Sequence, residues 1–433
     1  MNLHKIRAVS QHLFLGVARA MRFSLRKNRA MAIRFGSHLP WSRFGRTAKV
    51  SAVSAAMVLG LASCTLDYTV GYVYVTTNKS NPGLIDQYAI DFDTGAVSQI
   101  GTPVAAGNDP VTLVASPSGK FVYVINQGDS TVQEFAVQGD GTLASKNVYP
   151  VTGTRPTAVA IDPQGAFLYV TYTYQAGYSA TKPGPGGVSI FPVNKDNSLG
   201  TPSNQNVGNN PVGVTVSYFN HFVYVLDQEA EPNAKILGFS QNTTTGALTP
   251  IAGTSITATS TTGYAAGVVP SAIAEEPTSR YVYVTDQVAN QLIGYTVLPS
   301  GALQAMVNGP FVTGLYPVNL TIDPTGTLIY VVNYNASTMQ GYMINGATGT
   351  PSGAVGSFAT GTGTGPTCVA IDPALGVFLY TSNSLDNTIT GERVNPNTGG
   401  LQTVQNSPYN ASPQPSCLTV VPSGAHATET IFP

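Results

Sequence analysis

A four-residue motif with tyrosine at its third position recurs seven times along the chain, and it constrains the fold more than any other feature. The motif spans Tyr72–Val75, Phe121–Val124, Phe167–Val170, Phe222–Val225, Tyr281–Val284, Leu328–Val331 and Phe378–Thr381. Its tyrosines are 49, 46, 55, 59, 47 and 50 residues apart. A period of about 50 residues indicates a repeat architecture in which each unit is one small sheet. Because such a sheet buries its faces only against its neighbours, seven units predict a closed ring.

Each repeat also contains a proline and a tight turn. The proline stands thirteen positions before the tyrosine at Pro110, Pro156, Pro211, Pro270 and Pro317, and fourteen before it at Pro366. An apolar run follows, and then a turn such as that of residues 162–165, Asp-Pro-Gln-Gly, whose residue types suit a type I turn. Two further alternating runs, joined by a turn such as the Thr-Gly-Ala-Leu of residues 245–248, complete the repeat. Four strands between such turns predict one propeller blade.

The two ends of the array complement each other. The first repeat begins at Tyr72 and lacks the proline-containing strand, whereas residues 415–424 repeat that strand alone. We therefore expect the C-terminal segment to supply the inner strand of the first blade, which leaves no open edge there. The predicted fold is an all-β, seven-bladed propeller of four-stranded blades.

The first 63 residues differ in composition from the rest. They contain 11 Lys or Arg and no acids, whereas residues 64–433 contain 9 basic and all 21 acidic residues, a formal charge of −12. Basic residues up to Lys49 and an apolar stretch over 50–62 predict a secretory signal. That stretch is shorter than the roughly 20 residues of a membrane-spanning helix. We expect a leader over 1–63, a tether over 64–69 and the propeller over 70–433.

The end of the apolar stretch, Leu61-Ala62-Ser63-Cys64, resembles a bacterial lipobox. This resemblance implies cleavage before Cys64 and diacylglycerol on its sulfur. The expectation is a monomeric lipoprotein of the cell envelope, facing the periplasm or the cell surface. The alternative is a plain signal peptide followed by a chance cysteine. The propeller segment has no basic stripe, which excludes nucleic acid as a partner.

The repeats resemble a known family. Asn or Asp shortly after the tyrosine motif, at Asn126, Asp227, Asp286, Asn333 and Asn383, is similar to YVTN-type propellers. The proline strand and the Thr-Gly-x-Leu turn are similar to those of the lactonase family, which includes bacterial 6-phosphogluconolactonases and fungal carboxymuconate-lactonizing enzymes. The resemblance covers roughly residues 70–425. It implies a seven-bladed propeller and lactone chemistry, with a histidine, arginines and a glutamate in the central pocket and the histidine often directly after a blade proline.

The chain departs from that pattern at the histidine. The residues that follow the prolines are Val111, Thr157, Val212, Ser271, Val318, Thr367 and Ser416. After residue 63 there are only two histidines, His221 in a hairpin turn and His426 in the C-terminal tail. This departure favours a binding role over catalysis.

Loops before the prolines and loops after the tyrosine motif are expected on one face of the ring, and function concentrates in loops on a rigid scaffold. The predicted binding residues of this face are Asp109, Arg155, Asn126, Tyr172, Asp227, Asp286, Asn333 and Asn383. The alternative for the Asn and Asp positions is that they cap strand ends and bind local backbone. Two insertions, at 175–187 and within 240–269, are expected on the same face.

Arg155 is the sharpest single candidate, because a guanidinium beside the channel binds a carboxylate or phosphate through two parallel hydrogen bonds. It is also the one weak candidate for a catalytic residue. The alternative is a solvated arginine paired with a neighbouring aspartate.

We expect no cofactor and no metal, although Asp227, Glu229, Glu231 and Asp286 are a conceivable oxygen set for a hard cation. The adjacent pair Glu275 and Glu276 is interpreted as structural, because Glu276 takes the aspartate place of a hairpin turn. Cys368 and Cys417 occupy equivalent positions on neighbouring inner strands. We predict two buried thiols there, with a disulfide as the alternative.

Two functions follow. The first is an envelope module that binds a protein, glycan or small molecule through its loop face. The second is a lactonase acting on a sugar or organic-acid lactone, with Arg155 holding the anionic group and an acid of the same face activating water.

Overall fold

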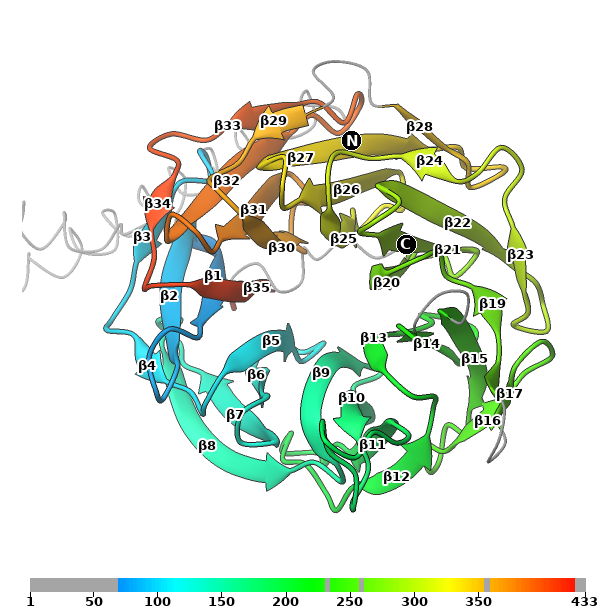
Figure 1. The fold of residues 1–433 in the computed structure, drawn as a ribbon. Coiled ribbons are helices and arrows are strands. Elements are labelled where there is room, and N and C mark those ends of the chain that lie inside the picture. Colours follow the sequence, from blue (N-terminus) through cyan, green and yellow to red (C-terminus); the bar gives the residue numbers. More distant parts are fainter. Residues whose placement is uncertain (1–68, 230–233, 257–260, 354–358, 425–433) are drawn as a thin grey trace, which may run out of the picture. The chain divides into compact units, whose positions relative to one another are not determined.

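The computed structural model describes residues 69–229, 234–256, 261–353 and 359–424. In these ranges the regular structure is β throughout, and no helix is long and apolar enough to cross a membrane. The leader, Cys64 and the rest of the predicted tether up to residue 68 lie outside the described residues, and Thr69 already belongs to the first described strand. Seven sheets are arranged around a central channel (Figure 1). The predicted seven-bladed propeller is therefore confirmed.

Each blade contains four antiparallel strands, ordered from the channel outward. The inner strands are β35 (Pro415–Pro422), β5 (Pro110–Ala115), β9 (Thr154–Ile161), β13 (Pro211–Val216), β20 (Pro270–Glu275), β25 (Pro317–Ile322) and β30 (Pro366–Ile371). The second strands, which carry the tyrosine motif, are β1 (Thr69–Thr77), β6 (Phe121–Asn126), β10 (Phe167–Tyr174), β14 (Phe222–Asp227), β21 (Tyr281–Asp286), β26 (Leu328–Asn333) and β31 (Phe378–Asn383).

The outer half of each blade is less regular. The third strands are β2 (Leu84–Asp91), β7 (Thr131–Val137), β11 (Gly187–Pro192), β15 (Lys235–Gln241), β22 (Gln291–Val297), β27 (Thr338–Ile344) and β32 (Thr388–Val394). The fourth strands are β3 (Val97–Gln99), β8 (Leu143–Pro150), β12 (Ser203–Asn206), β16 (Leu248–Pro250), β23 (Leu303–Ala305), β28 (Pro351–Gly353) and β33 (Leu401–Thr403). Short strands lengthen five outer edges, namely β4 (Val104–Ala105), β19 (Tyr264–Ala265), β24 (Phe311–Val312), β29 (Ala359–Gly361) and β34 (Tyr409–Asn410). The insertion before β19 contains the hairpin β17 (Ser255–Ile256) and β18 (Thr261–Thr262).

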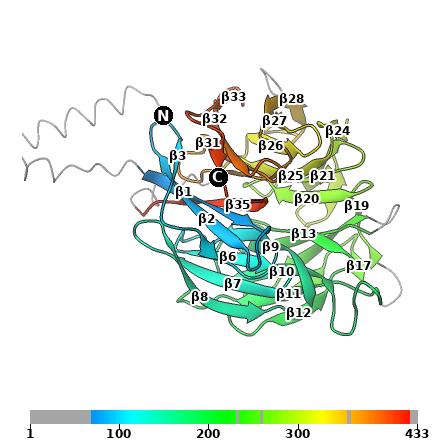
Figure 2. The same ribbon diagram turned by 60° about the vertical axis from the view of Figure 1, so that its left-hand side comes forward.

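The ring closes as the sequence predicts. The C-terminal strand β35 pairs antiparallel with β1, in a register that sets Tyr74 opposite Thr419. The two strands, from opposite ends of the chain, lie side by side in both views (Figure 1 and Figure 2). The first blade thus becomes four-stranded only when the last residues of the propeller join it.

The seven repeat tyrosines link neighbouring blades in a closed circuit. Each is fully buried, and its hydroxyl donates to a backbone carbonyl in the outer turn of the next blade. These bonds run from Tyr74 to Gly141, Tyr123 to Asn197, Tyr169 to Gly246, Tyr224 to Gly301, Tyr283 to Gly349, Tyr330 to Gly399 and Tyr380 to Gly95, at 2.6–2.9 Å. Every accepting residue has a positive φ, which explains why glycine occupies six of the seven sites. The motif is repeated because each blade must both give and receive one such bond.

Apolar packing follows the same plan. In the described residues, seven clusters of buried side chains lie one between each pair of neighbouring blades. The cluster between the last and first blades, for example, joins Phe378 and Ile389 to Val73 and Ile90. Fully burying one such side chain contributes about 1.5–3 kcal/mol. Because the clusters lie between blades, neighbouring blades stabilise one another and no single central core is needed.

The prediction of two free thiols is wrong, because Cys368 on β30 and Cys417 on β35 form a disulfide. Their Cα atoms are 4.9 Å apart, within the range that a disulfide requires. The inner strands converge on the channel, so equivalent residues of adjacent blades approach each other there. Thr112, at the same position of the next blade, also reaches the sulfur of Cys417 with its hydroxyl at 3.9 Å. The prediction failed because it assumed the usual distance between equivalent residues of neighbouring blades, and this distance is shortest beside the channel.

Candidate functional site

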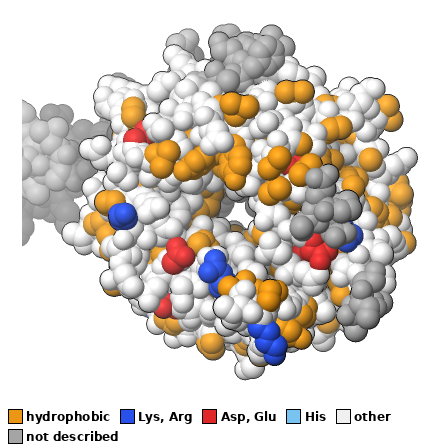
Figure 3. Space-filling view, viewed as in Figure 1, with side chains coloured by type: hydrophobic (Ala, Val, Ile, Leu, Met, Phe, Trp, Pro, Cys, Tyr) orange, Lys and Arg blue, Asp and Glu red, His pale blue; other side chains and the backbone are white. Residues whose placement is uncertain are grey.

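The inner-strand prolines and the ends of the second strands lie at the same end of the channel. Pro110 pairs with Asn126 and Pro211 with Asp227, so the loops before the one and after the other emerge together. We call this end the proline-side mouth, and we call the opposite end, where hairpins join the inner and second strands, the turn end. Along the ring axis, uncharged side chains dominate the surface around a central opening (Figure 3).

Six of the eight predicted binding residues occupy one repeat position, the position opposite the inner-strand proline. They are Asn126, Tyr172, Asp227, Asp286, Asn333 and Asn383, and each is 0% exposed. They point into the blades rather than toward a ligand at the surface. Their burial favours the alternative in which the Asn and Asp side chains hold the local backbone.

The asparagines hold the start of the third strand and, at Asn126, the loop before the proline. The Asn126 side chain accepts from the Gly107 amide at 3.1 Å and donates to the Thr131 hydroxyl at 3.2 Å. Asn333 and Asn383 donate to threonine hydroxyls five residues further on, at 3.2 and 3.0 Å. These asparagines fix the shape of the mouth.

The two aspartates hold their loops through backbone amides. Asp227 accepts from the amides of Asn209 at 3.2 Å and Asn210 at 2.7 Å, and Asp286 does the same with the amides of residues 268 and 269. Gly208 passes so close that a Cβ there would lie 2.2 Å from the Asp227 carboxylate. Burial raises the pKa of Asp227 to about 6, against the lowering effect of the amides of Asn210 and Asn209.

Tyr172 and Asp109 also make hydrogen bonds within the protein. The Tyr172 hydroxyl donates to the side chain of Asn204 on β12. Asp109 is half-buried, and its carboxylate accepts from the side-chain amide of Asn78 at 3.0 Å. Neither residue lies free at the mouth.

The residues directly after the prolines have a role that the sequence did not reveal. Where that residue carries a hydroxyl, the hydroxyl donates to the proline carbonyl of the next blade. These bonds are Thr157 to Pro211, Ser271 to Pro317, Thr367 to Pro415 and Ser416 to Pro110, at 2.6–3.2 Å. Where valine follows the proline, at residues 111 and 212, Gln127 and Gln228 reach the next proline carbonyl instead, at 3.0 and 2.8 Å. The position that the family resemblance assigns to histidine therefore braces the inner strands here.

Arg155 differs from the other candidates because its side chain is exposed. Its guanidinium donates to the amide oxygen of Gln127 at 3.1 Å. Among the described residues the ion pairs are Lys235 with Glu229 and Arg280 with Glu276, and neither involves Arg155. The predicted alternative, a pair with a neighbouring aspartate, is therefore not found in the described part of the chain.

A cleft of about 500 Å³ opens at the proline-side mouth, between the third and fourth blades. Its walls are Thr173, Tyr174, Pro183, Gly184, Asn209 and Asn210. The Arg155 guanidinium lies outside this lining and contacts Gln127 of the second blade. The Thr173 hydroxyl donates to the Arg155 carbonyl at 3.3 Å, which ties the cleft wall to the arginine. The insertion over 175–187 forms one wall, as expected for an insertion on this face. Amide, hydroxyl and aromatic groups thus surround a concave space. Arg155 belongs to the same mouth, and neither ion pair found among the described residues involves it.

The candidate cation ligands do not assemble. In the described ranges no group of three or more His, Cys, Asp and Glu side chains is placed to hold a metal ion. Glu229 pairs with Lys235 at 3.6 Å, and Glu231 lies outside the described residues.

The ring of seven four-stranded blades, with its polar cleft at the proline-side mouth, defines a seven-bladed β-propeller with a candidate ligand site. The family described as "Lactonase, 7-bladed beta-propeller" matches residues 72–218 and 214–371. This chain belongs to the lactonase family of seven-bladed β-propellers.

Individual relatives are more distant. The 6-phosphogluconolactonase of Bacillus subtilis (strain 168) is 24% identical over 236 residues, which cover 53% of this chain and 63% of the relative. The chain thus matches less than two thirds of that relative's length. A putative 6-phosphogluconolactonase from Bacteroides uniformis has a similar fold, with a TM-score of 0.67 and 19% identity over 82% of this chain and all of that one. The periplasmic gluconolactonase of Pseudomonas aeruginosa gives a TM-score of 0.66 and 18% identity over 82% and 99% of the two chains.

Proposed function

We propose that this protein is an envelope-anchored binding propeller whose cleft at the proline-side mouth takes a saccharide that carries an acidic group. The observation that carries the proposal is the exposed Arg155 side chain at the same mouth as the cleft, with the Arg155 carbonyl tied to the cleft wall by the Thr173 hydroxyl. A planar guanidinium binds a carboxylate through two parallel charge-assisted hydrogen bonds. Asn209, Asn210 and Thr173 supply donors and acceptors that suit sugar hydroxyls, and Tyr174 supplies an apolar face.

Binding is favoured over catalysis by how the other polar groups are used. Asp227 and Asp286 accept backbone amides, and the residues after the prolines brace neighbouring strands. A general base must reach the proton that it removes, and groups engaged in this way are held away from a ligand.

Lactone hydrolysis is the second candidate. It is supported by membership of the lactonase family and by the similarity to the Bacillus subtilis 6-phosphogluconolactonase. In this alternative Arg155 holds the anionic group of the substrate, and an acid of the same face activates water.

The membrane anchor is a separate part of the proposal, and it depends on the lipobox-like sequence that ends at Cys64. A Cys64→Ser variant should no longer incorporate a labelled fatty acid or fractionate with membranes. Unchanged labelling in that variant would remove lipidation from the proposal.

Titration calorimetry with the full-length chain in non-ionic detergent tests the ligand. We expect glucuronate oligosaccharides to bind and the matched neutral glucose oligosaccharides to bind at least about tenfold more weakly, because a charge-assisted hydrogen bond contributes roughly 1.5–3 kcal/mol. Arg155→Ala should remove this preference, and Arg155→Lys should restore only part of it.

The same preparations distinguish the two functions when they are mixed with 6-phosphogluconolactone and gluconolactone. Turnover above the spontaneous rate that falls in Arg155→Ala would replace the binding proposal with the lactonase. Equal affinity for acidic and neutral oligosaccharides, without turnover, would contradict both.

A further inference from the structure

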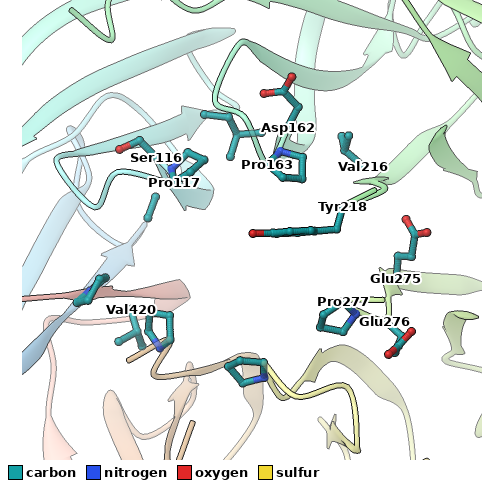
Figure 4. Close-up of a pocket in the computed structure, with 15 residues that line it drawn as sticks. Ser116, Pro117, Asp162, Pro163, Val216, Tyr218, Glu275, Glu276, Pro277 and Val420 are labelled. Atoms are coloured by element: carbon teal, nitrogen blue, oxygen red, sulfur yellow. The ribbon is translucent and has the colours of Figure 1, made fainter. Parts of the chain in front are cut away.

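A second cavity lies at the turn end of the channel, opposite the proline-side mouth. It has a volume of about 420 Å³. The hairpin turns contribute a ring of prolines to its wall, namely Pro117, Pro163, Pro277, Pro324, Pro373 and Pro422. Figure 4 shows Tyr218 extending between Pro163 and Pro277 into this space, with the Glu275 carboxyl beside it. The cavity is mainly apolar, with an acidic side.

Two residues of the cavity break the sevenfold repeat. The turn position that is proline in six blades is Tyr218 in the fourth. The last position of the inner strand is apolar in six blades, at Ala115, Ile161, Val216, Ile322, Ile371 and Val420, and is Glu275 in the fifth. The fold does not require Glu275, because six blades have an apolar residue at this position. The turn that carries Tyr218 also differs in shape from the other hairpins, because its positive φ is at His221. The two exceptions lie on adjacent blades and face one cavity.

Glu275 is incompletely paired. One carboxyl oxygen accepts from the Ser217 hydroxyl at 2.8 Å, across the boundary between the two blades. The other oxygen is buried and has no partner at hydrogen-bond geometry among the described residues, although the Ser279 hydroxyl is near enough to lower the pKa of the carboxyl. Burial raises the pKa of Glu275 to about 8, with a smaller raising effect from Glu276. A buried oxygen without a partner costs about 1–3 kcal/mol, and a ligand that donates to it would recover that free energy.

Glu276, by contrast, serves its own turn, as the sequence predicted. Its carboxylate accepts from the Thr278 hydroxyl at 2.8 Å and pairs with Arg280 at 4.0 Å. The sequence interpretation of the two glutamates as one structural pair therefore applies to Glu276 and misses Glu275. The comparison of equivalent positions across the repeats is the signal that would have found it.

We propose that the turn-end cavity binds an organic ammonium ion, with Glu275 as its counter-ion and Tyr218 and the proline ring as its apolar wall. This site is distinct from the cleft at the proline-side mouth and does not depend on it.

Charge complementarity selects the cation. The ionisable acids of the cavity wall are Asp162, Glu275 and Glu276, and no Lys or Arg is among its lining residues. An anion would meet acids alone, and a purely apolar ligand would leave the Glu275 oxygen unpaired. An ammonium group donates to that oxygen, and the face of Tyr218 attracts the same charge. The apolar body of the ligand then contacts the prolines.

Binding would be coupled to a proton. The ligand keeps its own proton, and the Glu275 carboxylic acid loses one to solvent when it becomes the counter-ion, so one proton is released for each ammonium ion bound at neutral pH. The groups around Glu275 that also carry or change charge are Asp162, Glu276, Tyr218 and Tyr224, with Arg280 beyond Glu276 and His221 at the end of the Tyr218 turn. Affinity for the ammonium ion should therefore rise with pH up to about 8.

The experiment is a titration of the full-length chain with benzylammonium, its neutral analogue benzyl alcohol and its anionic analogue benzoate, followed by ligand-observed NMR and calorimetry. We expect benzylammonium to bind at least about tenfold more tightly than benzyl alcohol, because a hydrogen bond to a charged partner contributes roughly 1.5–3 kcal/mol. Benzoate should not bind. Glu275→Gln should remove the preference for the cation, and Tyr218→Pro should weaken binding severalfold.

Three controls keep the result interpretable. Glu275→Ile restores the residue type of the other blades, so it should fold and fail to bind benzylammonium. Arg155→Ala should bind benzylammonium as well as the unaltered chain does. Calorimetry in buffers of different ionisation enthalpy should show the released proton. Equal binding of benzylammonium and benzyl alcohol, or full binding by folded Glu275→Ile, would overturn the proposal.

Discussion

The two ends of the channel are built from the same seven repeats and both hold their loops with recurring buried polar residues, yet they differ in the residues that interrupt the recurrence. At the proline-side mouth the repeat position opposite each proline is buried, and five of the six candidate residues there are Asn or Asp side chains that hold strands and loops. At the turn end the position directly before the turn is apolar in six blades, and Glu275 departs from it with a buried oxygen that lacks a partner. An oxygen without a partner does not by itself separate the two ends, because Asn333 and Asn383 also have one. What sets Glu275 apart is that no other blade has a polar residue at its position.

Recurrence around the ring separates structural side chains from candidates for function. A side chain that recurs around the ring makes the same structural contact in every blade. Such a contact does not recognise an asymmetric ligand in the channel. The residues to test for function are those that interrupt the recurrence. Arg155, which is the single arginine before a blade proline, and Glu275 both satisfy this rule.

The largest effect is expected from Glu275→Ile at high pH. The folded state holds the Glu275 proton more tightly than the unfolded state, so its contribution to stability is present below about pH 4.5 and is lost as the pH rises to about 8. The variant lacks this loss. Its free energy of unfolding in urea should exceed that of the unaltered chain by at least about 2 kcal/mol at pH 9, at about 1.4 kcal/mol for each unit of pKa shift less solvent screening.

Ala115→Ile, at the same repeat position of another blade, is the matched control. It changes the apolar wall without changing a titratable group, so its stability should depend on pH as that of the unaltered chain does. If Glu275→Ile shows that same dependence, the two ends of the channel do not differ as described.

Thr157→Val at the proline-side mouth is expected to lower the stability of the protein, with a smaller effect than that of Glu275→Ile. The hydroxyl donates to the Pro211 carbonyl at 2.6 Å, and valine already occupies the equivalent position in three blades. Removing the bond and leaving the carbonyl unpaired should cost about 1–3 kcal/mol in urea unfolding. Thr157→Ser keeps the hydroxyl and should retain most of the stability; an equal loss in both variants would show that the brace contributes nothing.

A gain is expected from Tyr218→Pro if the fourth-blade turn can take the shape of the five hairpin turns that have proline at this position, which differ from it in the place of the positive φ. Proline at a compatible position restricts the unfolded chain and stabilises by roughly 0.4–1 kcal/mol. The melting temperature should therefore rise slightly while benzylammonium binding weakens. A melting temperature that falls would mean that Tyr218 is a structural residue of its turn.

The smallest effect on stability is expected from Arg155→Ala. The side chain is exposed and makes one hydrogen bond, to the neutral amide of Gln127, so the free energy of unfolding should change by no more than about 0.5 kcal/mol. The same variant should lose its preference for acidic saccharides. A large drop in stability would place Arg155 with the scaffold residues of the mouth.

The fold could be predicted almost completely from the sequence, because the same motifs recur in each blade of the propeller. The tyrosine motif located the seven second strands, the prolines located the inner strands, and the missing strand of the first repeat predicted the partner of β1. What the sequence could not provide was distance across the ring. The disulfide between Cys368 and Cys417 and the bond from Thr157 to the next blade both depend on how closely the inner strands converge.

For the candidate site, the sequence predicted which end of the ring it lies on, but not which residues form it. Register placed Asn126 and Asp227 correctly at the proline-side mouth, but the alternation of side chains that buries them was not considered for the last residue of the strand. The cleft at the proline-side mouth requires the course of the 175–187 insertion, which has no repeat to guide it. Glu275 was present in the sequence as one of a pair, and only comparison with its six equivalents separates it from Glu276.

Ring closure sets an order of events when the chain is made. β1 is the first propeller strand to be synthesised and β35 is the last, so one edge of β1 waits for a partner more than three hundred residues away. The bond from Tyr380 to Gly95 and the apolar cluster around Phe378 must wait as well. Contacts so distant in sequence form slowly, and an unpaired strand edge invites aggregation. The ring therefore remains open until its final strand is available, which makes the pairing of β35 with β1 the step that completes the fold.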